Sequence, residues 1–156
     1  MAFNTKKLKL IFQQMSTEAA NTAAKIMQEK LKIAAELCVA RFYASYNPKV
    51  YSRNYGLYNS FQENLSLSSG LDSAIAEVDF NSSNMGEWYH DPANYIYEMA
   101  VHNGVHGESS IAISDPILEM MNAEYQKLLG ERPAIAQSVM SAVAGKYAGK
   151  IQQTIN

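Results

Sequence analysis

The chain is poor in cysteine, and it has no long hydrophobic run. Cys38 is the only cysteine among 156 residues, so a disulfide within the chain is excluded. It stands between Leu37 and Val39 in a helical pattern, which predicts a small buried thiol rather than a nucleophile. No segment is apolar for long enough to cross a bilayer. The run from Leu8 to Phe12 contains Lys9 and is too short for the core of a secretion signal.

Positive charge is missing from the middle of the chain. No Lys or Arg occurs from Asn54 to Gln126, whereas eleven carboxylates do: Glu63, Asp72, Glu77, Asp79, Glu87, Asp91, Glu98, Glu108, Asp115, Glu119 and Glu124. Residues 1–50 instead hold eight Lys or Arg against three Glu. A protein that grips nucleic acid needs clustered cations, so this middle region is not expected to bind phosphate. It is either a solvated acidic surface or one that must repel DNA.

Proline and glycine are also absent between Leu8 and Tyr46, which leaves room for one long helix. Its apolar residues form two adjoining rows: Ile26, Ile33, Leu37 and Ala40 in one, and Met27, Leu31, Ala34, Cys38 and Phe42 in the other. Lys25, Glu29, Lys32 and Glu36 recur on the opposite, solvent side. The helix is expected to end before Pro48. A start nearer Ser16, with Ser16 or Thr17 as the cap, is an alternative.

The residues after this helix predict a small antiparallel sheet. In "SAIAEVDF", Ala74, Ala76, Val78 and Phe80 alternate with Glu77 and Asp79, which indicates a half-buried strand. The segment "YIYEMAV", residues 95–101, is predicted as a second strand for the same reason. "IAI", residues 111–113, is a short strand or a packed connection.

Two helices are expected at the C-terminal end. Asp115 suits the cap of the first, Pro116 its first position and Gly130 its end. The second starts at Pro133 and carries apolar residues at steps of four: Ile135, Val139, Val143, Tyr147 and Ile151. The predicted class is α+β, with a long N-terminal amphipathic helix, a small antiparallel β-sheet and two C-terminal helices. Residues 1–156 are expected to form a single domain, with residues 1–7 as a flexible arm and 47–61 as a tyrosine-rich connection.

The three histidines are the candidates for chemistry. His102 and His106 have a zinc-like spacing, but Gly104 and Gly107 break the helix that such a pair needs. His90 lies beside Asp91, without a nucleophile motif. We therefore predict no catalytic residue, no metal and no cofactor. The alternative is a small ligand- or metal-binding module, or an enzyme of a mobile element, that uses the His90, His102 and His106 region.

The connection from Tyr43 to Phe61 is rich in tyrosine: Tyr43, Tyr46, Tyr51, Tyr55 and Tyr58. Tyrosine provides a large contact area at low entropic cost and keeps a hydroxyl for hydrogen bonding, so such clusters favour protein interfaces. Two other uses stay open. The rings either cover the sheet and the first helix, or stack on a ligand.

The sequence of this connection, "YNPKVYSRNYGLYNSF", resembles a segment of the head-tail joining and tail-completion proteins of tailed bacteriophages, which are neck or connector components. Pro48, Arg53, Leu57 and Ser60 match the order of that family's motif, whereas Asn54 and Tyr55 stand where it has Thr-Gly and Gly56 comes slightly late. "YIYEMAVHNGVHG" is similar to the family's strand and glycine turn, and "SDPILEMM" to the helix that follows.

The resemblance implies a structural virion protein rather than an enzyme. It implies a ring of identical subunits at the head-tail interface, assembled in the host cytoplasm, that contacts other neck, portal-side and tail-tube or tail-terminator proteins. Genome DNA would pass through the ring without specific binding, and no membrane is involved. The implied assembly interface includes Pro48, Tyr51, Arg53, Tyr55, Gly56, Leu57 and Tyr58. The basic first third and the acidic remainder are expected to supply complementary faces between neighbouring subunits.

Overall fold

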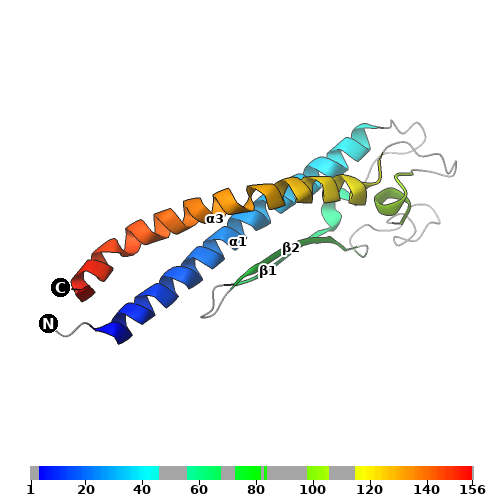
Figure 1. Ribbon diagram of the computed structural model, residues 1–156. Helices are drawn as coiled ribbons and strands as arrows, with labels where there is room; N and C mark the ends of the chain where they lie inside the picture. The colour runs from blue at the N-terminus through cyan, green and yellow to red at the C-terminus, as the bar shows by residue number, and fades with distance from the viewer. Residues whose placement is uncertain are drawn as a thin grey trace. The chain divides into compact units, whose positions relative to one another are not determined.

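The computed structural model describes residues 4–45, 56–67, 73–81, 83, 98–105 and 115–155. Its elements are α1 (Thr5–Ala44), η1 (Tyr58–Ser60), β1 (Phe61–Ser66), β2 (Ile75–Phe80), η3 (Glu98–His102) and α3 (Ile117–Ile155), as Figure 1 shows. A mixed α+β fold that opens with a long helix is therefore confirmed. The chain forms two compact units, one of residues 1–29, 64–77 and 129–156 and the other of residues 30–63 and 78–128. We describe each unit by itself.

Helix α1 starts earlier than the Ser16 alternative. The backbone N–H of Lys7 donates to Oδ1 of Asn4 at 3.1 Å, and the N–H of Leu8 donates to the carbonyl of Asn4 at 3.1 Å, so Asn4 is the N-cap. Ser16 and Thr17 lie inside the helix, and a cap at either is wrong. Residues 5–7, expected in a flexible arm, are helical. The helix ends at Ala44; Pro48 lies outside the described residues.

Helix α3 replaces the two predicted C-terminal helices. It runs for 39 residues without a break and contains Pro133, so the expected end at Gly130 is wrong. Proline removes one helical hydrogen bond and crowds the preceding turn. Tertiary packing outweighs this local cost, because Leu128 before the proline and Val139 after it are both buried, in the second and the first unit respectively.

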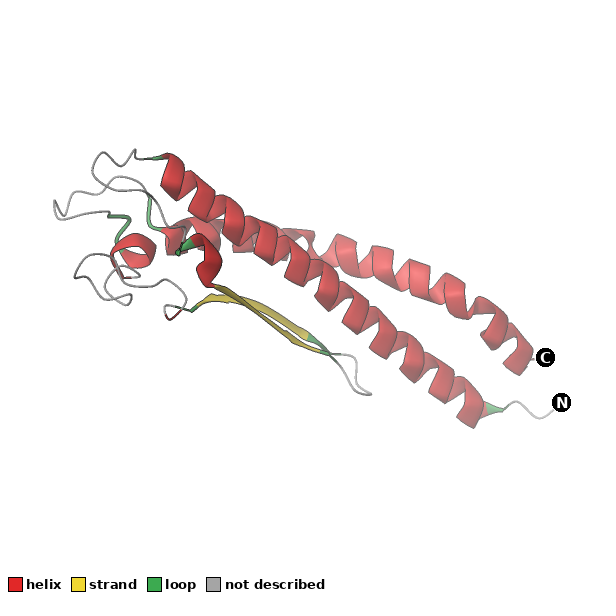
Figure 2. Cartoon of the chain, turned by 180° about the vertical axis from the view of Figure 1, so that it is seen from behind, coloured by secondary structure: helices red, strands yellow, loops and turns green. Residues whose placement is uncertain are grey.

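Strands β1 and β2 form a two-stranded antiparallel sheet (Figure 2). The alternation predicted for β2 is confirmed, because Ala76, Val78 and Phe80 are half-buried and the residues between them are exposed. Strand β1 was not predicted from the sequence. Only Phe61 in it is half-buried, so its hydrogen-bonded pairing, rather than an apolar pattern, makes it a strand.

The predicted strand over residues 95–101 is wrong for its described part. Residues Glu98–His102 form η3, a single wide helical turn, and residues 95–97 lie outside the described residues. Ala100 and Val101, neighbours in sequence, are 2% and 0% exposed. A strand would point them to opposite faces, whereas a helical turn buries both in one core. The "IAI" segment also lies outside the described residues.

Gly104 allows the chain to leave η3. Its φ of 62° is in the left-handed region, and the N–H of Val105 donates to the carbonyl of Met99 at 2.9 Å across it. We expect Gly104→Ala to lower the free energy of unfolding by about 1–2 kcal/mol, because a Cβ is disfavoured at this φ. Gly104→Asn should cost less, since asparagine visits this region more readily. Urea unfolding of both variants tests this, and equal losses would contradict it.

The first unit has an apolar core between α1 and α3. Ile11 and Met15 of α1 pack with Val139, Val143 and Tyr147 of α3. The apolar steps of four predicted for the last helix are thus confirmed; Ile135 and Ile151, at either end of the row, pack against the same cluster. The first turns of α1 and the last turns of α3 lie next to each other (Figure 1). The Nε2 of Gln28 also donates to the carbonyl of Glu77 at 2.7 Å, which attaches the hairpin to α1.

A polar cluster borders this core. Glu18 of α1 accepts hydrogen bonds from the ammonium of Lys146 and, at 2.9 Å, from the hydroxyl of Tyr147. The Lys146 hydrogen bond, followed by that of Tyr147, lowers the pKa of the Glu18 carboxyl below its ordinary value. The Nζ of Lys150 lies 4.9 Å from the centre of the Tyr147 ring. These contacts hold the two helices in register.

This cluster predicts a loss of stability in acid. Because the pKa of Glu18 is lowered by folding, its contribution is present above the ordinary glutamate pKa of about 4.3 and is lost as pH falls through the folded value. Glu18→Gln should therefore destabilise the protein more at pH 7 than at pH 3. Urea unfolding of both proteins at the two pH values measures the difference. An equal difference at both pH values would mean that the carboxylate contributes nothing through its charge.

The second unit has its own core. Cys38, Val39 and Phe42 of α1 meet Leu57, η3 residues Ala100 and Val101, and Ile117 of α3. Cys38 is 0% exposed, and burial raises the pKa of its thiol, so the predicted buried thiol is confirmed. Among the described residues of this unit, Phe42 and Ile117 are the largest fully buried side chains.

Candidate functional site

The tyrosine-rich connection is only partly described. Pro48, Tyr51, Arg53 and Tyr55 lie outside the described residues, and Gly56, Leu57 and Tyr58 lie within them. These three lead directly into β1 and belong to the second unit. The structure therefore describes only the C-terminal end of the predicted interface.

Leu57 is part of the fold rather than of an exposed interface. It is 6% exposed and belongs to the core of the second unit. Ser60, fully buried, donates from its Oγ to the carbonyl of Leu57 at 2.6 Å, and its own carbonyl accepts from the N–H of Asn81 at 2.7 Å. Gly56 is also buried. Gly56, Leu57 and Ser60 thus form the buried side of a corner that leads the chain into the hairpin.

Tyr58 has both a structural and an exposed side. Its ring lies edge-on to Phe61 with centroids 6.2 Å apart, and Phe61 packs on Phe80 at 5.0 Å. The side chain nevertheless stays 37% exposed. The covering role predicted for the tyrosine rings therefore applies to Tyr58, and part of its ring stays at the surface.

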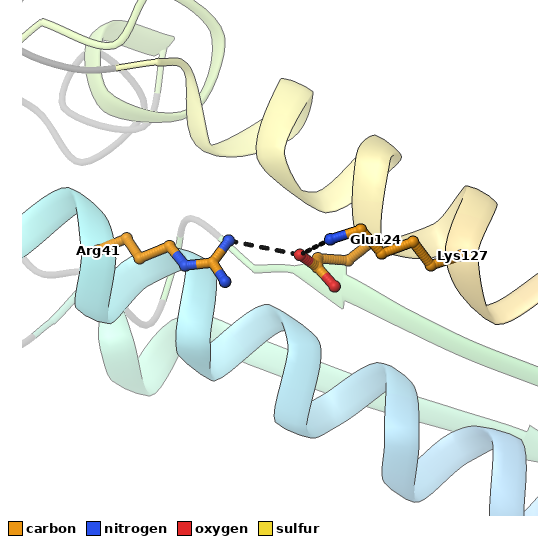
Figure 3. Close-up of polar contacts among 3 residues, drawn as sticks. All are labelled: Arg41, Glu124 and Lys127. Atoms are coloured by element: carbon orange, nitrogen blue, oxygen red, sulfur yellow. Dashed lines mark hydrogen bonds and ion pairs between the residues drawn. The ribbon is translucent and has the colours of Figure 1, made fainter.

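Charges from the basic first third and the acidic remainder pair inside the second unit. Lys32 lies 2.6 Å from Glu63, and Glu124 lies 2.7 Å from Lys127 and 3.3 Å from Arg41 (Figure 3). The Lys127 hydrogen bond is the main cause of the lowered pKa of Glu124. Exposed pairs of this kind contribute little free energy. They do show that part of the charge difference between the basic first third and the acidic remainder is neutralised by ion pairs within one chain.

The outward face of the hairpin is polar and acidic. On β2, Ile75, Glu77 and Asp79 are exposed, while the residues between them turn towards the protein. On β1, Gln62 shares the outward face, because its neighbour Phe61 packs on the inward-facing Phe80 and successive strand residues point to opposite faces. Neither strand contains a Lys or Arg. Two carboxylates therefore stand on this face without a basic residue on either strand.

A groove of about 630 Å³ opens in the second unit beside η3. Its walls are mostly apolar and come from Leu31, Ala34, Ala35, Val78, His102, Pro116, Leu118, Glu119, Met121, Asn122 and Tyr125. The Nε2 of His102 is 3.9 Å from a Glu98 oxygen, too far for a hydrogen bond. No three metal-ligating side chains gather among the described residues, and His90 and His106 lie outside them.

One predicted core row of α1 is exposed in the second unit. Ile33 and Leu37 are 49% and 51% exposed, and Ala40 is exposed too, whereas Cys38 and Phe42 of the other row are buried. The expectation that the first row packs in the core is thus wrong for these three residues. Apolar periodicity marks both rows alike, and only the position of the packing partners distinguishes them.

The features that stand out in the described parts of the chain are surfaces: the corner with Tyr58, the outward hairpin face and the exposed row of α1. No helix in the described residues is long and apolar enough to cross a membrane. Comparisons with family models, with curated proteins and with solved structures found no match to this chain.

Proposed function

We propose that this protein is a structural subunit of a bacteriophage neck, which forms a ring between head and tail and lets genome DNA pass. The observation that supports it most is the buried corner. Of the four residues that match the neck-protein motif, Leu57 and Ser60 are described, and they are 6% and 0% exposed where α1 gives way to the hairpin. These two motif residues are thus buried where the chain enters the hairpin, which is consistent with a motif that serves the fold.

The outward hairpin face supports the passage of DNA. A surface that lines a DNA path should not attract phosphates, because each cation-phosphate contact strengthens binding. Glu77 and Asp79 are exposed there, and no Lys or Arg occurs from Asn54 to Gln126. Tyr58 offers an aromatic contact to neighbouring subunits and neck proteins.

Electron microscopy of the purified protein, alone and mixed with DNA-filled phage heads or with isolated tails, tests this function. The expected result is a ring with a central opening, assembled at one end of either particle and absent from the protein alone. The alternative, a ligand-binding or catalytic module, predicts no such attachment. A protein that never forms rings or attaches to either particle, or that purifies with one zinc per chain, would overturn the proposal.

A variant at Tyr58 separates assembly from folding. Tyr58→Ser keeps the buried corner, since the hydrogen bond of Ser60 goes to the backbone of Leu57. We expect helix content by circular dichroism to stay near normal and joined particles to be reduced. Normal joining by this variant would place the assembly surface away from Tyr58.

A further inference from the structure

The exposed row of α1 in the second unit has the spacing of a coiled-coil seam. Ile33, Leu37, Ala40 and Ala44 follow one another at steps of four, three and four, and all four are exposed. These steps are those of the d and a positions of a heptad. The row is narrow, with no second apolar row exposed beside it, because Cys38, Val39 and Phe42 face the core. A narrow seam of this kind suits one partner helix.

Opposite charges border the two sides of this row. Glu36 precedes the a position of Leu37 and occupies g, with Glu29 one heptad earlier on the same side. Arg41 follows the d position of Ala40 and occupies e, on the other side. The arrangement therefore has an acidic border and a basic border along one apolar row.

The charge pattern selects the partner and its direction. In a parallel pair of identical helices, g of one chain faces e of the other five residues later, which places Glu36 beside the partner's Arg41 twice. In an antiparallel pair, g faces g and e faces e, so like charges would meet. Arg41 is available for such a contact, because its side chain is 58% exposed and lies 3.3 Å from Glu124, whose nearer partner is Lys127.

We infer that a second copy of this chain covers the exposed row, with the two α1 helices parallel in this region. The seam has only four core positions, two of them alanine, so it buries much less than a standard interface and the pair should dissociate on dilution. This inference concerns the isolated protein and does not rest on the proposed neck function. Either can fail while the other holds.

Sedimentation equilibrium over a concentration series tests the pair. The wild-type mass should rise towards that of two chains, and Ile33→Gln with Leu37→Gln should hold it at that of one. The matched control is Leu10→Gln with Phe12→Gln, which removes two apolar side chains of the same helix that are 59% and 50% exposed but lie outside the row. The control should associate like the wild type. A wild type that stays monomeric throughout, or a control that dissociates equally, would overturn the inference.

A mixing experiment tests the parallel direction. Glu36→Lys and Arg41→Glu should each be monomeric alone, because each brings like charges together across the seam. In a mixture, the lysine introduced at position 36 of one chain would face the glutamate introduced at position 41 of the other, and the unchanged Glu36 would face the unchanged Arg41. Mixed pairs should therefore recover the wild-type mass. Circular dichroism shows whether each variant is folded before mixing. Folded variants that associate alone, or that fail to pair when mixed, would exclude the parallel arrangement.

Discussion

Phe42→Ala should lower the free energy of unfolding by about 3–5 kcal/mol, the range for removing a buried aromatic ring. Phe42 is 1% exposed and lies in the core of the second unit with Cys38, Leu57 and Ile117. Removal of the ring would leave a cavity among these side chains. Because they come from three separate segments, they cannot fill it without a movement of the backbone. A loss of this size is a large share of the stability of an ordinary domain.

Phe12→Ala is the matched control, because Phe12 is 50% exposed on the same helix. Its substitution should change stability by no more than about 0.5 kcal/mol. Urea unfolding followed by circular dichroism compares the two variants in one helix and for one residue type. Equal losses of stability in the two variants would mean that Phe42 does not face the core of the second unit.

Reversing the charge of the outward hairpin face should create DNA binding that salt removes. Glu77→Lys with Asp79→Lys turns two exposed carboxylates into two ammonium groups on a surface that has no other cation on either strand. Two phosphate contacts predict an affinity that falls about tenfold between 50 and 200 mM salt. Gel-shift assays across this range measure the binding. Under the proposed neck function, virions that carry the same variant should also eject their genome more slowly.

The control for this reversal is Glu29→Lys with Glu131→Lys, which changes the net charge equally at exposed helix positions outside the hairpin strands. If net charge alone caused DNA binding, control and hairpin variant would bind alike. Stronger binding by the hairpin variant would show that the position of the carboxylates matters. The wild type, with a formal net charge of −2, should not bind in either assay.

Several features of this fold were predictable from local pattern. The lack of Pro and Gly before Pro48, with apolar residues at helical spacing, predicted α1. Alternation predicted β2, and steps of four predicted the row of α3 that packs in the first unit. The site was less predictable: the sequence places Gly56, Leu57 and Tyr58 in one predicted interface, yet Gly56 and Leu57 are buried and Tyr58 is partly exposed.

The sequence by itself determined where chain segments are helical or extended over long periodic stretches, because such periods reflect the geometry of the backbone. Tertiary structure decided the rest. Packing on both sides of Pro133 kept α3 whole, and a shared core turned Glu98–His102 into a helical turn instead of a strand. It also decided that Cys38 and Phe42 are buried while Ile33 and Leu37 are exposed. Two apolar rows on one helix look alike in sequence, and only the elements that pack against the helix determine which row is buried.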